Sequence, residues 1–425
     1  MPINVLKNSI ANGKFDKDFS LMYKDNAFAR ERYTEAVDSF GELFGDAEEI
    51  RLFSAPGRTE VGGNHTDHQH GAVLAGSVDL DVIAVVAENN DNTVRIKSQG
   101  YDMDVIDLND LEPCEKEYGR ASALIRGMCA IIKQEGFKIG GFNAYTTSNV
   151  LKGSGLSSSA AFEVLVGVIL SHLFNNGAID PVEIAKIAQK SENIYFGKPC
   201  GLMDQMASSV GGFTAIDFND PKAPIIEKVD FDLAAHNHSL CIVNTGGNHA
   251  DLTGDYAAIT DECKAVSNEM GKDFLRDVDI DEFYKNIPAL REKCGDRAVL
   301  RAIHFFDENQ RAVAEKDALK NNKFDEFLNI VKESGCSSYR FLQNVFSVSA
   351  PKEQGLSLAL ALTERFLGDK GACRVHGGGF AGTIQAFVPN DMLDGYKNMI
   401  ESVFGEGNCY VLNIRPVGGY ALSEK

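Results

Sequence analysis

Residues 153–161 read Gly-Ser-Gly-Leu-Ser-Ser-Ser-Ala-Ala, between an expected strand over residues 141–147 and an apolar helix expected from about Ser157 to Phe174. Glycine lets backbone N–H groups approach an anion, and a following helix adds the positive end of its dipole and its unpaired N–H groups. The chain contains no Gly-x-x-x-x-Gly-Lys-[Ser/Thr] pattern, so this is not a Walker A loop. The segment indicates either a phosphate-binding loop, with hydroxyls suited to phosphate and Mg²⁺, or a serine-rich helix cap.

A polar segment upstream, residues 57–70, reads Gly-Arg-Thr-Glu-Val-Gly-Gly-Asn-His-Thr-Asp-His-Gln-His. Its residues His65, His68, His70 and Asp67 carry side chains that bind zinc and other transition metals. Asn, His and Asp side chains also match the hydrogen-bond donors and acceptors of a polyol. A solvated loop without a ligand is the third alternative, and the spacing alone leaves all three open.

Two acidic residues, Glu192 and Asp204, follow the expected helix. Glu192 falls on the apolar stripe of a second helix, which starts at Asp180-Pro181, so we expect its carboxylate to be buried. A buried carboxylate needs a counter-charge, which either Mg²⁺ bound with a loop hydroxyl or a basic side chain would supply. Asp204 follows a glycine-containing break over residues 197–201, where it either reaches into a cleft or caps a short helix.

A glycine-rich segment near the carboxyl end, residues 377–382, matches the dinucleotide-binding pattern Gly-x-Gly-x-x-Gly. A strand over residues 383–388 follows it, whereas dinucleotide binding requires a helix there and a surrounding βαβ unit. We therefore expect a tight turn that brings backbone close to a neighbouring ligand or loop.

The hydrophobic pattern indicates both helices and strands along the chain. Apolar spacing predicts a helix from Phe28 to Gly45, and a dense polar loop is expected over residues 56–71. Further strands are expected over residues 51–55, 73–88, 93–98, 240–245 and 409–414, with helices over 203–210 and 392–404. Because the second half is more helical, we place a domain division near residue 225, which gives domains over residues 1–225 and 226–425.

The net charge of the 425 residues is −19, from 42 Lys and Arg against 61 Asp and Glu. Binding of nucleic acid or of a membrane surface relies on basic patches, so this acidic excess argues against both kinds of partner. The nine cysteines lie singly, and the sequence contains neither a signal-peptide core nor an apolar run of membrane-spanning length. We therefore expect a cytoplasmic protein with reduced cysteines.

In this order and at these spacings, the segments resemble the GHMP small-molecule kinase superfamily and, within it, the galactokinase family. The resemblance implies an α+β fold of two domains, the GHMP kinase fold, with the active site in the interdomain cleft. It also implies an enzyme that uses ATP and Mg²⁺ to phosphorylate the anomeric hydroxyl of D-galactose, giving α-D-galactose 1-phosphate. The matching segments span almost the whole chain and are Phe40–Gly45, Ala55–Arg58, Asn64–Asp67, Gly155–Ala160, Cys200–Gln205 and His376–Gly382.

The same resemblance assigns a role to each matching residue. It implies that Asp204 is the base or orienting acceptor for the anomeric hydroxyl, and that Arg58 keeps Asp204 ionised and stabilises charge on the transferred phosphoryl group. Ser159 and Glu192 match the Mg²⁺ ligands. The sugar contacts are Asn64, His65, Asp67, Gly201 and Tyr256, and the ATP contacts are Gly153, Ser154, Gly155, Leu156, Ser157, Ser158 and Ser159. We expect a hexose and ATP as partners, and a monomer or weak homo-oligomer.

The departures from the family lie on the sugar side. Galactokinases usually read Arg-Val-Asn-Leu-Ile-Gly-Glu-His-x-Asp-Tyr, where residues 58–68 read Arg-Thr-Glu-Val-Gly-Gly-Asn-His-Thr-Asp-His. Asn64 removes a carboxylate from a position that in the family lies near the C6 hydroxyl, which would ease binding of a C6 carboxylate, as in galacturonate. Residues 246–249, before Tyr256, also depart from the family.

Two alternatives belong to other functional classes. One is a catalytically silent, galactokinase-like sugar sensor, although such sensors lack part of the Ser159-Ala160 segment that is present here. The other is a metal-dependent hydrolase that uses the histidine cluster, and sensitivity to zinc chelators in excess Mg²⁺ would be its signature.

Overall fold

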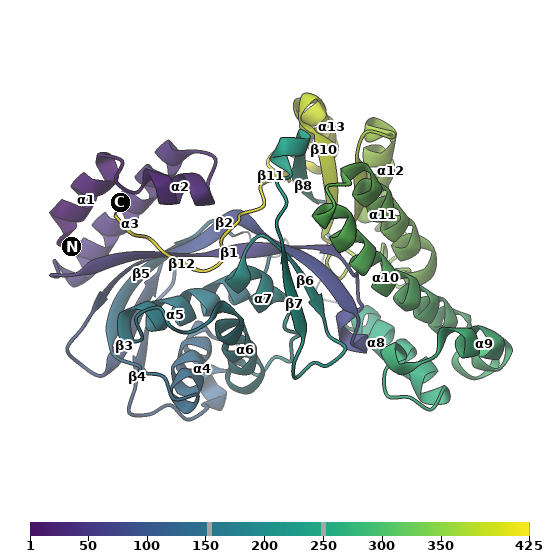
Figure 1. The fold of residues 1–425 in the computed structure, drawn as a ribbon, viewed down its shortest axis with the longest axis horizontal. Coiled ribbons are helices and arrows are strands. Elements are labelled where there is room, and N and C mark those ends of the chain that lie inside the picture. Colours follow the sequence, from purple (N-terminus) through teal and green to yellow (C-terminus); the bar gives the residue numbers. More distant parts are fainter. Residues whose placement is uncertain (151–154, 248–251, 425) are drawn as a thin grey trace.

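One long antiparallel strand pair forms the centre of the first sheet (Figure 1). The structure is a computed structural model that describes residues 1–150, 155–247 and 252–424. Strand β2 pairs with β1 along one edge, and its other edge is shared by β5 at the carboxyl end and β6 at the amino end. The sheet order is β12-β1-β2-β5-β3-β4, with β6 and β7 as a branch. The bounds are β1 Ile50–Gly62, β2 Ala72–Glu88, β3 Thr93–Ser98, β4 Met103–Asp107, β5 Phe142–Ser148, β6 Phe213–Asp217, β7 Ile225–Val229 and β12 Tyr420–Ala421.

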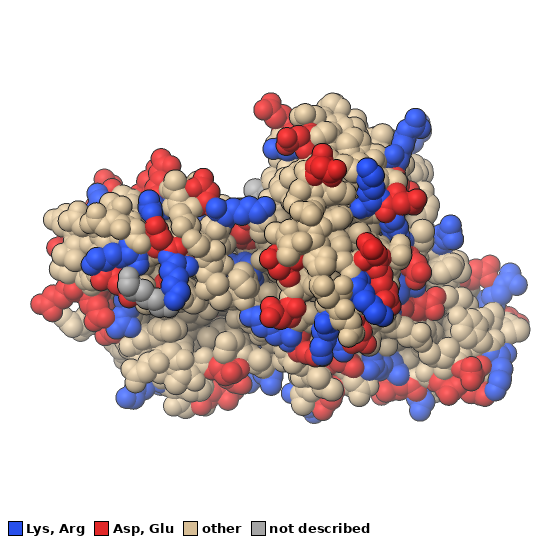
Figure 2. Space-filling model, turned by 45° about the horizontal axis from the view of Figure 1, so that its top comes forward, with Lys and Arg blue, Asp and Glu red and all other residues tan. Residues whose placement is uncertain are grey.

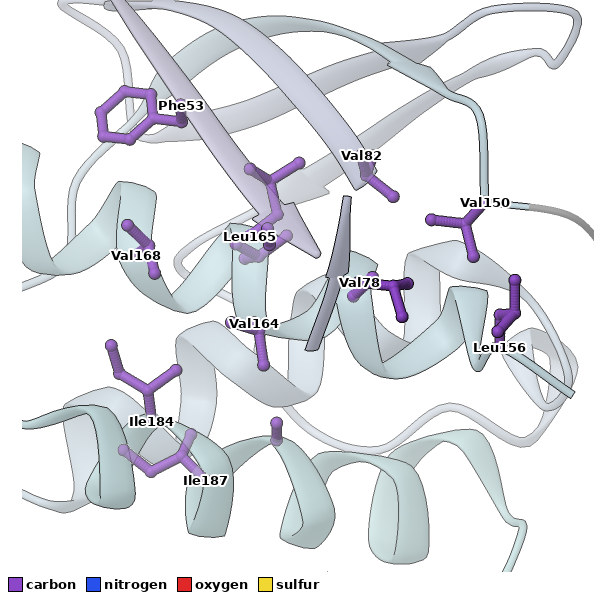
Figure 3. Packing of buried hydrophobic residues seen from close by; sticks show 14 of the residues in the cluster. Phe53, Val78, Val82, Val150, Leu156, Val164, Leu165, Val168, Ile184 and Ile187 are labelled. Carbon is purple, nitrogen blue, oxygen red and sulfur yellow. The ribbon is translucent and has the colours of Figure 1, made fainter. Parts of the chain in front are cut away.

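Four helices pack against one face of this sheet (Figure 1). Helix α5 is apolar on nearly all sides and is therefore buried between the sheet and its neighbour α6. Figure 3 shows this part of the core, with Leu165 and Val168 of α5 lying between Phe53 of the sheet and Ile184 and Ile187 of α6. The helices are α4 Ala121–Gln134, α5 Ser158–Phe174, α6 Pro181–Ser191 and α7 Met203–Val210.

The other face of the sheet is covered by three amino-terminal helices, α1 (Ile3–Ala11), α2 (Asp16–Met22) and α3 (Asn26–Phe44). The predicted helix ending at Gly45 is confirmed as α3, and the Asp25 side chain caps it by accepting from Ala27 N and Phe28 N. Helices α1 and α2 have no counterpart among the predicted elements.

Asp81 of β2 is fully buried and ties the helices to both ends of the chain. Its carboxylate accepts hydrogen bonds from Arg32 of α3, from Tyr23 and Ser54, and from Arg415 near the carboxyl end. Figure 1 shows the two chain ends on the same side of the molecule.

The second sheet has the order β11-β8-β10-β9 and is flanked by the helices of the second half (Figure 1). Its strands are β8 His238–Asn244, β9 Ala372–His376, β10 Thr383–Pro389 and β11 Cys409–Leu412, and the helices are α8 Thr253–Glu269, α9 Ile280–Cys294, α10 Asp296–Lys320, α11 Phe324–Ser337, α12 Gly355–Leu367 and α13 Leu393–Phe404. Short 3-10 or π turns are η1 Asp67–Gln69, η2 Glu115–Glu117, η3 Glu192–Phe196, η4 Ala234–His236, η5 Leu275–Asp277, η6 Ser338–Leu342 and η7 Asn390–Met392.

Most expected elements are present, and the α+β class is confirmed. The expected loop over residues 56–71 is wrong in its first half, because β1 continues through two register shifts to Gly62. The division at residue 225 stays a prediction. Strand β7 and the terminal β12 belong to the first sheet, and the second sheet begins at His238.

The surface carries charges of both signs. Figure 2 shows acidic and basic side chains intermingled on the face drawn there. All nine cysteines are free thiols. Among the described residues, no helix is long and apolar enough to cross a membrane.

Candidate active site

Arg58 and Asp204 form an ion pair where β1 meets α7. Arg58 Nε donates to Asp204 Oδ1 at 2.7 Å, and its Nη1 donates to the carbonyl oxygen of Gly155. The Ser157 hydroxyl donates to the other carboxylate oxygen of Asp204. Burial opposes ionisation of Asp204, but the Arg58 charge and these hydrogen bonds outweigh it, so the pKa of Asp204 lies below its usual value. Asp204 is therefore a preformed carboxylate.

The phosphate-loop candidate begins, within the described chain, at Gly155, whose φ of +73° lies in the left-handed region. Leu156 anchors the loop in the core beside Val150 (Figure 3), and Arg58 N–H donates to its carbonyl oxygen at 3.0 Å. Ser157 makes no capping bond to the described backbone of α5, because its hydroxyl goes to Asp204.

The start of α5 therefore does not bear out the serine-cap alternative. Ser158 and Ser159 form its first turn, where N–H groups have no partner within the helix. Gly153 and Ser154 lie outside the described residues.

Glu192 is buried, as its position on the apolar stripe predicts, and it lies in the π turn after α6. Gln205 Nε2 donates to Glu192 Oε2 at 2.8 Å and to Glu163 Oε2 at 3.3 Å. Lys198 Nζ lies 3.3 Å from Glu192 Oε1, so the basic counter-charge is present. Burial and repulsion from Glu192 raise the pKa of Glu163 well above its usual value.

A cavity of about 280 Å³ is lined by Met203, the residue before Asp204, and by three predicted sugar contacts, His65, Asp67 and Tyr256. The glycine-rich turn between β9 and β10 forms its far wall, as expected for a turn that approaches a neighbouring loop. His65 Nε2 donates to Gly378 O at 2.8 Å, and the Tyr256 hydroxyl donates to Gly379 O at 3.0 Å. A Cβ on Gly378 would lie 2.5 Å from the Tyr256 ring, so only glycine fits there.

Two of the three histidines of this segment have different partners. His65 is held by Gly378, and burial together with repulsion from His68 lowers its pKa to about 4. His70 stacks on Phe274, with 3.6 Å between the ring centroids. The described residues contain no group of three His, Cys, Asp or Glu side chains placed to hold a metal ion. The arrangement favours the polar-ligand alternative over the histidine metal site.

Gly201 lines a second cavity that shares Asp67 with the first. A Cβ on Gly201 would lie 2.9 Å from Asp67 Oδ2, so a side chain here would push the aspartate aside. The predicted contacts His65, Asp67, Gly201 and Tyr256 are therefore brought together.

Asn64 is placed differently from these residues. It is fully buried, and its Nδ2 donates to Glu60 Oε1 and to Gly377 O, both at 2.8 Å. Its Oδ1 accepts from Asn344 Nδ2 at 2.9 Å. Glu60 lines the cavity instead. The sequence contained a signal for Glu60, because the usual family pattern has Asn at this position and Glu60 departs from it.

Comparison with known proteins agrees with this geometry. A family model described as "Galactokinase galactose-binding signature" matches residues 38–88, and one described as "GHMP kinases N terminal domain" matches residues 123–212. A galactokinase of Streptomyces coelicolor is 31% identical over 372 residues, which cover 86% of this chain and 92% of that protein. The chain belongs to the galactokinase family. It is therefore an ATP-dependent sugar kinase.

Solved structures place the fold in the same family. The crystal structure of Lactococcus lactis galactokinase complexed with galactose superposes with a TM-score of 0.76 and 25% identity, covering 90% of this chain and 98% of that one. Methanococcus jannaschii mevalonate kinase, at 13% identity and a TM-score of 0.62, covers 86% of this chain and shares the fold.

Membership of the galactokinase family implies Mg²⁺, and the residues near Glu192 fit it. Mg²⁺ in kinases is held by one or two carboxylates and by substrate phosphates, so a single buried carboxylate is sufficient. Ser159 precedes Glu163 by one helical turn, and Glu163 shares the Gln205 amide with Glu192. Buried Glu163 Oε1 and Gln205 Oε1 have no partner among the described residues, which leaves acceptors for a metal-bound water.

Proposed function

We propose that this enzyme transfers the γ-phosphoryl group of ATP to the anomeric hydroxyl of D-galactose, giving α-D-galactose 1-phosphate and ADP. The observation that carries the proposal is the ionised Asp204, held by Arg58 and Ser157 between a phosphate-loop candidate and a polar cavity.

In this mechanism Asp204 orients the anomeric hydroxyl and accepts its proton. The hydroxyl oxygen attacks the γ-phosphorus, and the bond to the bridging oxygen breaks to release ADP. Arg58 lies next to the attacked group and stabilises charge on the transferred phosphoryl group. The N–H groups at the start of α5 bind the phosphates. Mg²⁺, held by Glu192 and Ser159, would neutralise phosphate charge.

Assay of purified protein with Mg-ATP against galactose, galacturonate and glucose tests the proposal. We expect the highest kcat/KM on galactose. A much higher kcat/KM on another sugar would refute galactose as the substrate. Binding of both sugar and ATP without turnover would favour the silent sensor. A cytoplasmic location and a monomer or weak homo-oligomer stay predictions, which cell fractionation and size-exclusion chromatography would check.

A further inference from the structure

We propose that Glu60, not Asn64, presents the carboxylate that selects the sugar, and that it favours a neutral hexose over a uronic acid. The inference rests on the proposed function, because it concerns the sugar bound beside Asp204. The proposal assigns the preference for a neutral hexose to one residue, Glu60.

The first observation is where the two side chains lie. Glu60 lines the cavity that His65, Asp67 and Tyr256 also line, whereas Asn64 is fully buried and does not line it. All side-chain hydrogen bonds of Asn64 go to protein groups, on Glu60, Gly377, Asn344 and Ser338. A sugar hydroxyl therefore meets Glu60 before it meets Asn64.

The second observation is how the carboxylate of Glu60 is used. Its Oε1 accepts from Arg374 Nη2 at 2.5 Å and from Asn64 Nδ2 at 2.8 Å. Within the described chain, Glu60 Oε2 accepts no hydrogen bond. It is also not one of the fully buried oxygens that lack a partner, so it is accessible to solvent. One oxygen is thus fixed by the protein while the other stays available to the cavity.

The third observation is that the carboxylate is retained, at position 60 of the sequence and not at position 64. The usual family pattern places Asn at the position of Glu60 and Glu at the position of Asn64, and this chain has the two exchanged. Because the two side chains are hydrogen-bonded to each other, either arrangement provides one amide donor and one carboxylate acceptor. The carboxylate that is absent at position 64 is therefore matched by one at position 60, which lines the cavity.

A buried cation lies against the carboxylate of Glu60. Arg374 of β9 is fully buried and also donates to Val61 O at 2.7 Å, so its guanidinium is fixed beside Glu60. Burial raises the pKa of Glu60 above its usual value, and the Arg374 charge and the Asn64 hydrogen bond limit that rise without reversing it. A second carboxylate, from the sugar, would face this one at close range and be repelled.

The test compares galactose and galacturonate binding, measured by calorimetry without ATP, in wild type and four variants. Glu60→Gln keeps the size of the side chain and removes its charge. We expect it to weaken galactose binding about 10- to 100-fold, the usual worth of a hydrogen bond to a charged group. We also expect the preference for galactose over galacturonate to fall by about 10-fold or more. The double variant Glu60→Asn/Asn64→Glu restores the usual pattern and should bind galactose within about three-fold of wild type.

Two controls keep the outcome interpretable. Asn64→Glu alone puts two carboxylates in contact and should lower the melting temperature, a loss that the double variant reverses. Glu49→Gln, on the exposed start of the first sheet, should change neither binding nor melting temperature. Wild-type galactose affinity and unchanged sugar preference in Glu60→Gln would overturn the proposal. Galactose binding without turnover in wild type would instead refute the proposed function and leave this test valid.

Discussion

Arg58 Nε lies 2.7 Å from Asp204 Oδ1, although 146 residues separate them in the sequence. The contact exists because β1 runs past its first bulge to place Arg58 at the start of α7. The phosphate loop shares both partners, since Gly155 accepts from Arg58 and Ser157 donates to Asp204. We therefore expect changes at Gly155 or Ser157 to alter Asp204, the proposed acceptor of the sugar's proton.

Replacing Asp204 by Asn should leave sugar binding nearly intact and lower kcat by about 10²- to 10⁴-fold, the usual worth of a general base. The amide keeps the shape of the site but cannot take the proton. Calorimetry with sugar alone and steady-state kinetics with Mg-ATP would check the two parts. Loss of sugar binding would show that Asp204 is chiefly a ligand contact.

Replacing Arg58 by Gln should raise the pKa of Asp204, because burial is then no longer outweighed by the guanidinium charge. The acidic limb of the profile of kcat/KM against pH should move to higher pH, and kcat should fall about 10²- to 10³-fold with the lost charge. Arg58→Lys is the matched control, since it keeps a charge but not the fork of donors. An acidic limb in Arg58→Gln that coincides with wild type would contradict this role.

Lys198 pairs with Glu192 at 3.3 Å and would compete with a divalent cation for that carboxylate. Its side chain is 63% exposed, so the ion pair is weak, and Lys198→Met should tighten Mn²⁺ binding without nucleotide by about two- to five-fold. Glu192→Gln should abolish this Mn²⁺ binding. Electron paramagnetic resonance of free Mn²⁺ would measure both, and unchanged or weaker binding in Lys198→Met would show that Glu192 is not the metal ligand.

Glu315 of α10 is fully buried, and neither carboxyl oxygen has a partner among the described residues. Burial and repulsion from Glu308 raise its pKa well above the usual value. A pKa that is higher in the folded state gives stability below the unfolded pKa, and this stability is lost as pH rises toward the folded pKa. Glu315→Gln should therefore unfold at a higher temperature than wild type at pH 8.

The difference in unfolding free energy between Glu315→Gln and wild type should become smaller toward pH 5. Between the unfolded and the folded pKa of Glu315, this difference grows by up to about 1.4 kcal/mol per pH unit. Thermal unfolding at both pH values measures it. Glu326→Gln, an exposed change on α11, is the control and should show no such gap. Equal pH dependence in Glu315→Gln and wild type would refute a neutral Glu315.

The sequence predicted elements well where local signals agreed. Asp180-Pro181 begins α6 as expected, because an Asp cap and a proline in the first turn are both local. The end of β1 was missed, since its polar residues Arg58, Thr59 and Glu60 read as a loop, yet they are buried beside partners far away in the sequence. Polarity indicates exposure only when no distant partner is present.

The candidate site shows the same limit. The family pattern placed His65, Asp67 and Tyr256 correctly around one cavity. The direction of Asn64 could not be predicted, because it is set by Asn344, 280 residues away. A motif gives the position of a residue along the backbone, whereas long-range contacts decide which of its atoms face the ligand.

The meeting of both chain ends at Asp81 and its neighbours has a consequence for synthesis on the ribosome. Asp18 accepts hydrogen bonds from Tyr420 and Ser423, and β12 adds the last strand to a sheet whose other members emerge much earlier. Asp81 also lacks one of its two cationic partners until Arg415 has been synthesised. The first sheet, although built mostly from the early part of the chain, cannot be completed until residues 415–421 have been synthesised. Nascent chains that stop short of residue 415 therefore lack one of the two cations beside Asp81 and leave an edge of the first sheet open, and an open edge can pair with another chain.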